Sequence, residues 1–153
     1  MLFRTHIAFA LFVALVLIYA NTINFSFVFF IAVMLFAALP DIDTPDSVVG
    51  RAIRPLSNLI RVVIGHRTVF HSVWFPIIIY YLLFWFNQTI AFAALFGYSS
   101  HLLLDILNEK GLKPLWPINF HISGPFRTGG FFEIILFFVI IILDLLLTIK
   151  LFL

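Results

Sequence analysis

The chain of 153 residues contains no cysteine, so disulfide bonds and thiolate-ligated metal sites are excluded. Charge is also scarce, because only 10% of the residues are charged against 63% that are hydrophobic. No charged residue occurs from Ile7 to Pro40 or from Ser72 to Ser100. A soluble domain of this length cannot bury so large an apolar fraction, so the composition indicates an integral membrane protein. The few basic residues fit a membrane topology and argue against a nucleic-acid partner.

Both uncharged runs are too long for one membrane crossing, which takes roughly 20 residues. Each has polar residues near its middle, at 21–24 and 87–89, that suit a tight turn. We therefore expect an all-α, polytopic membrane bundle of two helical hairpins and a fifth transmembrane helix from about Phe131 to Leu153. With no linker or low-complexity tract, residues 1–153 are expected to form a single membrane-embedded domain.

Between these hairpins, five apolar residues can share one face of a short helix: Leu56, Leu59, Ile60, Val63 and Ile64. This spacing predicts a short helix that lies in the membrane interface. A loop helix packed on the bundle fits the same pattern equally well. The later loop, 108–130, is rich in glycine and proline and is expected to be irregular.

The basic residues gather on one side of the predicted bundle. Arg4 precedes the first helix, and the rest of this group lies in the two long loops: Arg51, Arg54, Arg61, Arg67, Lys110, Lys113 and Arg127. By the positive-inside rule, the N-terminus and both loops face the cytoplasm. The sequence thus predicts a multi-pass protein of the cytoplasmic (inner) membrane with an external C-terminus.

Histidines and acids are concentrated where apolar segments meet these cytoplasmic loops. They open or close successive segments: His6, then Asp41 with Asp43, then His71, and last His101 with Asp105. Imidazole and carboxylate groups together are the ligands of zinc, manganese and iron sites. The placement therefore predicts a polynuclear metal site at the cytoplasmic face.

His101 and Asp105 stand at i and i+4, so both side chains lie on one helix face and can reach one ion or two adjacent ions. Asp41 and Asp43 belong to an Asp-Ile-Asp segment, which we expect to be extended with both carboxylates on one side. One of them can ligate while the other bridges or orients a histidine. The alternative is a capped helix end with a solvated turn. Asp46 and Ser47 fit that alternative better, as N-cap residues of a short helix.

Further candidates surround this set. His66 and His71 flank Arg67, which is either a phosphate clamp or a positive-inside arginine. If the third helix begins near Thr68, His71 lies in its first turn. His6 and Glu133 complete the ring of ligands from the first and fifth helices, or are ordinary interfacial polar residues.

Two polar residues lie outside this ring. His121, in the second long loop, is also a candidate ligand. Asp144 lies well into the fifth helix and is expected to bond within the bundle, with Thr148 one turn on as its partner.

The chain resembles a known family through motifs that occur in a fixed order: Pro40-Asp41-Ile42-Asp43, residues 53–60, Gly65-His66-Arg67 through His71-Ser72, Ser100-His101 through Asp105, Leu115-Trp116-Pro117, and Thr128-Gly129-Gly130 with Glu133. From His6 to about Glu133 it is similar to the YdjM-like, LexA-binding family of inner-membrane metal-dependent hydrolases. That family is distantly similar to zinc-dependent phospholipase C and the P1-type nucleases. Those enzymes hold three zinc ions through ligands that include an H-x-x-x-D and an H-x-x-x-E pair.

The resemblance implies roles for particular residues. His101 with Asp105 matches the first pair, but Gly129 stands where the second pair would place the histidine before Glu133. Two ions are therefore a better expectation than three, with zinc first and manganese second. Among these residues, Asp43, Arg67 and Glu133 are assigned to catalysis.

The leading interpretation is a membrane-bound metal-dependent hydrolase, a phosphoesterase that acts on a lipid or lipid-linked substrate at the cytoplasmic face. The alternative is a divalent-cation transporter or metal-sensing membrane protein. A transporter places its binding groups near the bilayer midplane, whereas these candidates cluster at one end and only Asp144 approaches the membrane interior. A purely structural membrane partner leaves the buried acids unexplained. The sequence carries no signal for an oligomeric state.

Overall fold

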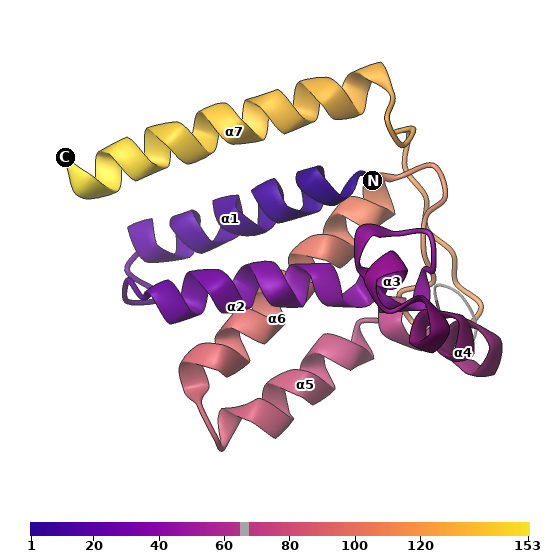
Figure 1. The fold of residues 1–153 in the computed structure, drawn as a ribbon. Coiled ribbons are helices and arrows are strands. Elements are labelled where there is room, and N and C mark those ends of the chain that lie inside the picture. Colours follow the sequence, from indigo (N-terminus) through magenta and orange to yellow (C-terminus); the bar gives the residue numbers. More distant parts are fainter. Residues whose placement is uncertain (65–67) are drawn as a thin grey trace.

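Apolar helices pack against one another, and the two long polar connections, 39–73 and 108–130, lie at the same end of the bundle (Figure 1). The computed structural model describes residues 1–64 and 68–153. The apolar helices in this part of the chain are α1 (Phe3–Tyr19), α2 (Phe27–Ala38), α5 (Trp74–Phe84), α6 (Gln88–Leu107) and α7 (Phe131–Phe152). Helix α6 contacts α1, α2 and α5, and α7 packs on α1. The predicted all-α bundle with two hairpins, α1–α2 and α5–α6, is therefore confirmed.

Short helical pieces form the polar end of the molecule. The 3₁₀ helix η1 (Leu39–Asp43) continues α2 and leads into α3 (Val48–Ala52) and α4 (Arg54–Ile64), and η2 (Val69–His71) precedes α5. Ser47 caps α3 by accepting a hydrogen bond from Gly50 N, as the sequence predicts. The loop 108–130 returns to the same end and contains only isolated bridges, which confirms its irregular course.

Small residues allow α2 and α6 to lie close together. The buried core between the helices contains Ala10, Ala14, Ala32, Ala37 and Ala93. Gly97 marks the closest approach, because a Cβ atom built there would lie 2.3 Å from Val33 O of α2. Helices in membranes commonly pack through such small residues. This contact matters for function, since α6 carries His101 one turn after Gly97.

Two of the described helices are long and apolar enough to cross a membrane, α6 and α7. The expectation of five full-length transmembrane helices is therefore corrected. Helix α2 has 12 residues and α5 has 11, which give about 18 Å and 16 Å of helix against a hydrocarbon core of about 30 Å. The 3₁₀ turn that begins at Leu39, with Pro40 next to it, ends α2 early.

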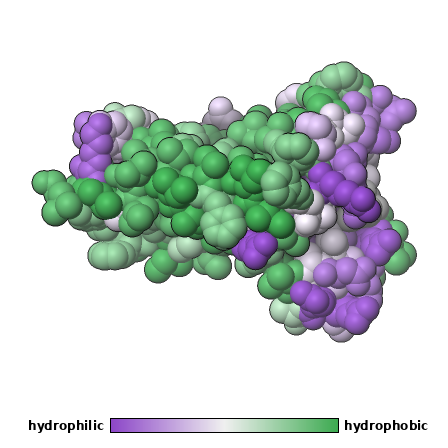
Figure 2. Space-filling view, turned by 90° about the horizontal axis from the view of Figure 1, so that it is seen from above, coloured by the Kyte–Doolittle hydropathy of each residue, from purple (hydrophilic) through white to green (hydrophobic). Residues whose placement is uncertain are grey.

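The outer surface of the helices is hydrophobic, and hydrophilic residues concentrate at the end that carries α3 and α4 (Figure 2). Helix α7 ends within one residue of its predicted limits and exposes most of its apolar side chains. In α4, Leu56, Leu59 and Val63 are exposed, so this predicted face is not packed on the bundle. Helix α4 contacts η1 and α3 through its other side, where Ser57 is buried, so a loop helix in contact with the bundle and an interfacial helix both fit the structure.

Candidate metal centre

The predicted ligands meet at the polar end of the bundle because different elements begin or end there. His6 lies in the first turns of α1, Asp41 and Asp43 in η1, and His71 in η2. His101 and Asp105 lie in the last turns of α6. These segments are distant in sequence, so the close helix packing, rather than any local motif, brings them together.

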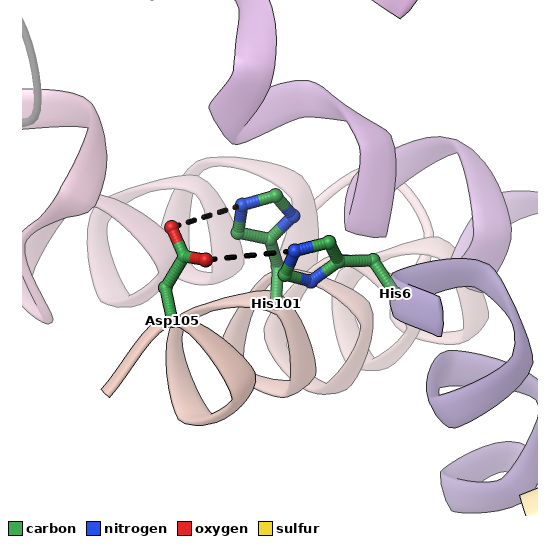
Figure 3. Close-up of side chains that lie close together, drawn as sticks. All are labelled: His6, His101 and Asp105. Carbon is green, nitrogen blue, oxygen red and sulfur yellow. Dashed lines mark ion pairs between the residues drawn. The ribbon is translucent and has the colours of Figure 1, made fainter. Parts of the chain in front are cut away.

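Asp105 is the carboxylate that the histidines share. Its Oδ1 lies 3.5 Å from His6 Nε2, and its Oδ2 lies 3.6 Å from His71 Nε2 and 3.7 Å from His101 Nε2. Figure 3 shows the stacked rings of His6 and His101 on the same side of Asp105, one facing each carboxylate oxygen. All four side chains are buried. Each imidazole thus presents the same ring nitrogen to one carboxylate, as ligands of a cation do.

Contacts behind the rings set which nitrogen faces Asp105. His101 Nδ1 lies 2.7 Å from Ala37 O, so it carries the proton and leaves Nε2 as the free acceptor. His71 Nδ1 lies 3.3 Å from Asp43 Oδ2, although this contact lacks the geometry of a hydrogen bond. A carboxylate or carbonyl behind a ligating histidine is the usual arrangement in metal sites, because it orients the ring.

The expected conformation of the Asp-Ile-Asp segment is wrong, because η1 is a 3₁₀ helix rather than an extended strand. Its two acids consequently point to different places. Asp43 is fully buried behind His71, whereas Asp41 is partly exposed and its Oδ1 lies 4.0 Å from His101 Nε2. His71 also differs from expectation, since it lies in η2 and precedes the first residue of α5, Trp74.

Among residues 1–64 and 68–153, two groups offer ligand atoms close enough to hold an ion. One contains His6, His101 and Asp105, and the other contains Asp41, His71 and His101, with the ligand atoms of each group within 4.8 Å of one another. The rings of His6 and His101 stack with centroids 3.8 Å apart. Because Ala37 occupies Nδ1 of His101, this ring has one nitrogen for a metal and cannot serve an ion in each group.

The donor set fits a divalent cation. Among the described residues, no hydrogen-bond partner reaches His6 Nδ1, either ring nitrogen of His71, or His101 Nε2, although all are buried. Buried polar atoms almost always have a partner, and leaving one without costs about 1–3 kcal/mol. Three imidazoles and two carboxylates are the ligand types of zinc and manganese. The arrangement can therefore hold a cation where a core built for stability alone would place apolar side chains.

Glu133 lies outside both ligand groups and connects α1 to α7. Its carboxylate accepts hydrogen bonds from Leu2 N (2.5 Å), Thr5 Oγ1 (3.0 Å) and Gly129 N (2.6 Å). Next to it, the amino group of Met1 lies 3.2 Å from Asp105 Oδ1. The structure thus gives Glu133 a positioning role, since it holds the first turn of α1 and with it His6.

The remaining sequence candidates are placed elsewhere. His66 and Arg67 lie outside the described residues. His121 is exposed, and its Nε2 lies 3.1 Å from Lys110 O. Asp144 is buried in α7, but the Thr148 hydroxyl donates to the Asp144 carbonyl and not to its carboxylate. The expected side-chain pair between Asp144 and Thr148 is therefore corrected.

Several positioning residues were not predicted from the sequence. The Tyr98 hydroxyl donates to Phe70 O at 2.6 Å and so fixes η2, which carries His71. Thr5 donates to Glu133, and Ala37 supplies the carbonyl behind His101. Tyr98 precedes Asp105 by two helical turns on the same face, a spacing that could have indicated it. No sequence signal identifies the Ala37 carbonyl, because every residue has one.

Comparison with known proteins identifies the family. A family model described as YdjM inner membrane protein matches residues 1–151. The uncharacterized protein YvsG of Bacillus subtilis (strain 168) is 34% identical over 101 residues, which cover 63% of this chain and 63% of the relative. The inner membrane protein YdjM of Escherichia coli (strain K12) is 35% identical over 94 residues, which cover 57% of this chain and 48% of the relative.

These relatives are only partly spanned, since the matched region covers about half to less than two thirds of their length. No solved structure matches the chain. One of these relatives is named only as uncharacterized and the other only by its membrane location, and neither name describes a chemical activity. Because the family model covers nearly the whole chain, this protein belongs to the YdjM inner membrane protein family and is membrane-associated.

Proposed function

We propose that the protein is a membrane-bound, metal-dependent phosphoesterase that acts on a lipid or lipid-linked substrate. The observation that carries the proposal is the set of three buried imidazoles that face one buried carboxylate. His71 Nε2 and His101 Nε2 face Asp105 and lack hydrogen-bond partners among the described residues, so a cation bound beside Asp105 could ligate both nitrogens. The family assignment places this arrangement in a membrane-associated protein.

Asp105 is the residue best placed to serve two ions. Its Oδ1 faces His6, and its Oδ2 faces His71 and His101, with Asp41 on the same side. His6 with Asp105 would hold one ion, and Asp41, His71 and His101 with Asp105 would hold the other, because the single available nitrogen of His101 limits this ring to one ion. Divalent ions bound here would supply a water activated near neutral pH and polarise a phosphoryl group.

The chain's own residues divide into holding and positioning groups. Asp43 is buried behind His71 and orients it, so we assign it to positioning rather than to direct contact with substrate. Asp41 is partly exposed and borders a pocket, so a substrate can reach the centre past it. Glu133 secures His6 through its hydrogen bond from Thr5. The proposed clamp Arg67 lies outside the described residues.

A lipid-linked substrate suits the position of the centre. It lies at the polar end of a bundle whose sides are apolar, close to α4, which contacts η1 and exposes Leu56, Leu59 and Val63. A head group at the membrane surface would meet the site without leaving the lipid phase. The basic residues of the same end support a cytoplasmic location of the centre by the positive-inside rule. In this proposal the shorter helices α1, α2 and α5 are embedded beside α6 and α7.

The test combines metal analysis with a substrate panel. Protein purified in mild detergent should hold zinc or manganese and hydrolyse at least one phosphoester from a panel of phospholipids and soluble phosphate esters. His101→Ala should remove both metal and turnover. Less than one equivalent of any transition metal, with none gained on addition, would refute the proposal.

One observation favours the second candidate, a divalent-cation transporter. The Asp144 carboxylate is buried in α7, about three helical turns beyond Glu133, and neither oxygen has a hydrogen-bond partner among the described residues. An acid within a membrane helix often marks an ion pathway. Uptake of zinc or manganese by vesicles that contain the protein, abolished by Asp144→Asn, would favour transport over hydrolysis.

A further inference from the structure

A pocket of about 320 Å³ opens beside the candidate metal centre. Asp41, which approaches His101, forms part of its wall, and so does Met1, whose amino group contacts Asp105. The pocket is therefore lined by a member of one ligand group, Asp41, and by a neighbour of the other group, Met1. A group bound in the pocket would lie against the exposed side of the centre.

Two cations border the pocket. Arg51, in α3, and Lys110, in the turn after α6, are exposed and form no ion pair within the described part of the chain. The acid Asp46 also lines the pocket, but it lies 3.9 Å from Arg54 and points to solvent. Arg51 and Lys110 come from segments far apart in sequence, so the fold brings their charges to one cavity.

A hydroxyl donor completes the polar lining. Thr128 Oγ1 accepts a hydrogen bond from Asn108 Nδ2 at 2.8 Å, so its own proton remains available to donate into the pocket. The Ser47 hydroxyl is already engaged, because it donates to Asp41 O and accepts from Gly50 N. The pocket thus offers a guanidinium, an ammonium and a hydroxyl donor, a combination that suits an anion with several oxygens.

We propose that Arg51 and Lys110 bind the phosphate of the substrate and determine specificity for phosphate esters. This inference rests on the proposed metal-dependent function and adds residues and a ligand class to it. Arg51 provides the planar fork that matches two phosphate oxygens, and Lys110 provides a compact charge. The same phosphate chemistry occurs in a lipid head group and in a water-soluble ester, so the experiment distinguishes these sources.

A neighbouring pocket of about 250 Å³ is the rival anion site. It is lined by Lys110, Lys113 and His121, and it includes no residue of either ligand group. Lys113 therefore provides a matched control for Lys110. Arg61, an exposed arginine of α4 that lines neither pocket, provides the matched control for Arg51.

The first measurement is the binding of inorganic phosphate to the full chain in detergent, by phosphorus NMR or calorimetry, with metal content determined on each sample. Arg51→Gln and Lys110→Gln should each weaken phosphate binding about fivefold to tenfold, with metal content unchanged. Arg61→Gln and Lys113→Gln should leave both unchanged. Wild-type phosphate affinity in the Arg51 and Lys110 variants would overturn this assignment without affecting the proposed metal site. An equal loss of phosphate affinity in Lys113→Gln would assign the anion to the neighbouring pocket and would also overturn the assignment.

A second arm identifies the source of the phosphate. The protein is placed in phosphatidylcholine nanodiscs with or without phosphatidic acid, and the affinity for inorganic phosphate is measured again. A lower apparent affinity with phosphatidic acid, abolished in Arg51→Gln, assigns the pocket to a lipid head group. An unchanged affinity assigns it to a soluble phosphate ester. Absence of metal from the wild-type protein would instead refute the proposed function, whatever the phosphate result.

Discussion

Asp105→Asn is the substitution that tests the metal centre most directly. The change keeps the volume of the side chain and removes the charge that faces all three imidazoles. Asp105 is buried and lies within 3.7 Å of a ring nitrogen of His6, His71 and His101. Since it is the only carboxylate in contact with all three rings among the described residues, no neighbour can take its place.

The expected magnitude follows from ligand loss. Substitution of residues behind metal ligands costs 10–100-fold in affinity, so removal of a shared ligand should cost at least about 100-fold. At a free metal concentration about 100 times the wild-type Kd, binding stabilises the wild-type protein by about 2.7 kcal/mol. A 100-fold weaker variant would gain only about 0.4 kcal/mol from the same metal.

The assay is the rise in melting temperature on addition of zinc or manganese, with metal content measured by mass spectrometry. Because the same variant is compared with and without metal, any stability change of the metal-free form cancels. Asp144→Asn is the matched control, since Asp144 is also a buried carboxylate but lies outside both ligand groups. The opposite result would be full metal binding and a full rise in melting temperature in Asp105→Asn, with both lost in Asp144→Asn. It would show that the metal site lies deeper in the bundle than proposed, and it would favour the transporter.

Three further predictions test the supports of the site and its orientation. Asp43→Asn should weaken metal affinity about 10–100-fold in a chelator competition, because it removes the charge 3.3 Å from His71 Nδ1; unchanged affinity would exclude a positioning role. Gly97→Ala should cost about 1–3 kcal/mol of stability and weaken metal binding, because its Cβ would lie 2.3 Å from Val33 O and push α6 away from α2; an unchanged melting temperature and metal content would contradict this. Single cysteines at Asn58 and Gln88 should react with an impermeant reagent from opposite sides of the membrane. Gln88 is chosen over its neighbour Asn87 because the Asn87 side chain caps α6. Labelling of both cysteines from one side would refute the topology.

The cluster of candidate ligands could be predicted from sequence because each member marks the start or the end of an apolar segment. His101 and Asp105 do lie on one face of α6, as their i and i+4 spacing predicts. The conformation of Asp41 and Asp43 could not be predicted in this way, because a 3₁₀ helix and an extended segment fit the same five residues. The periodicity of apolar residues indicates the type of one long element, but it does not indicate the conformation of the short segment that follows this element.

The role of Glu133 could not be predicted from the sequence either, because it depends on contacts between segments that are distant in sequence. As a buried acid at the start of a membrane helix it resembles a metal ligand, but three donors from α1 and the preceding loop already occupy it. The lengths of α2 and α5 were also overestimated, because hydropathy continues through the turns that end these helices. Pro40 is the local signal for the end of α2, since it lies in the first turn of the 3₁₀ helix η1, which begins at Leu39.

The energetics of the buried centre argue for a bound cation over a purely structural role. Two buried ring nitrogens that face Asp105, His71 Nε2 and His101 Nε2, have no hydrogen-bond partner among the described residues. At about 1–3 kcal/mol each, they would cost on the order of 2–6 kcal/mol, which is a large part of the stability of a typical domain. Apolar side chains of the same volume would remove that cost. A cation ligated by these nitrogens would offset it, so the metal should stabilise the fold as well as serve the proposed reaction.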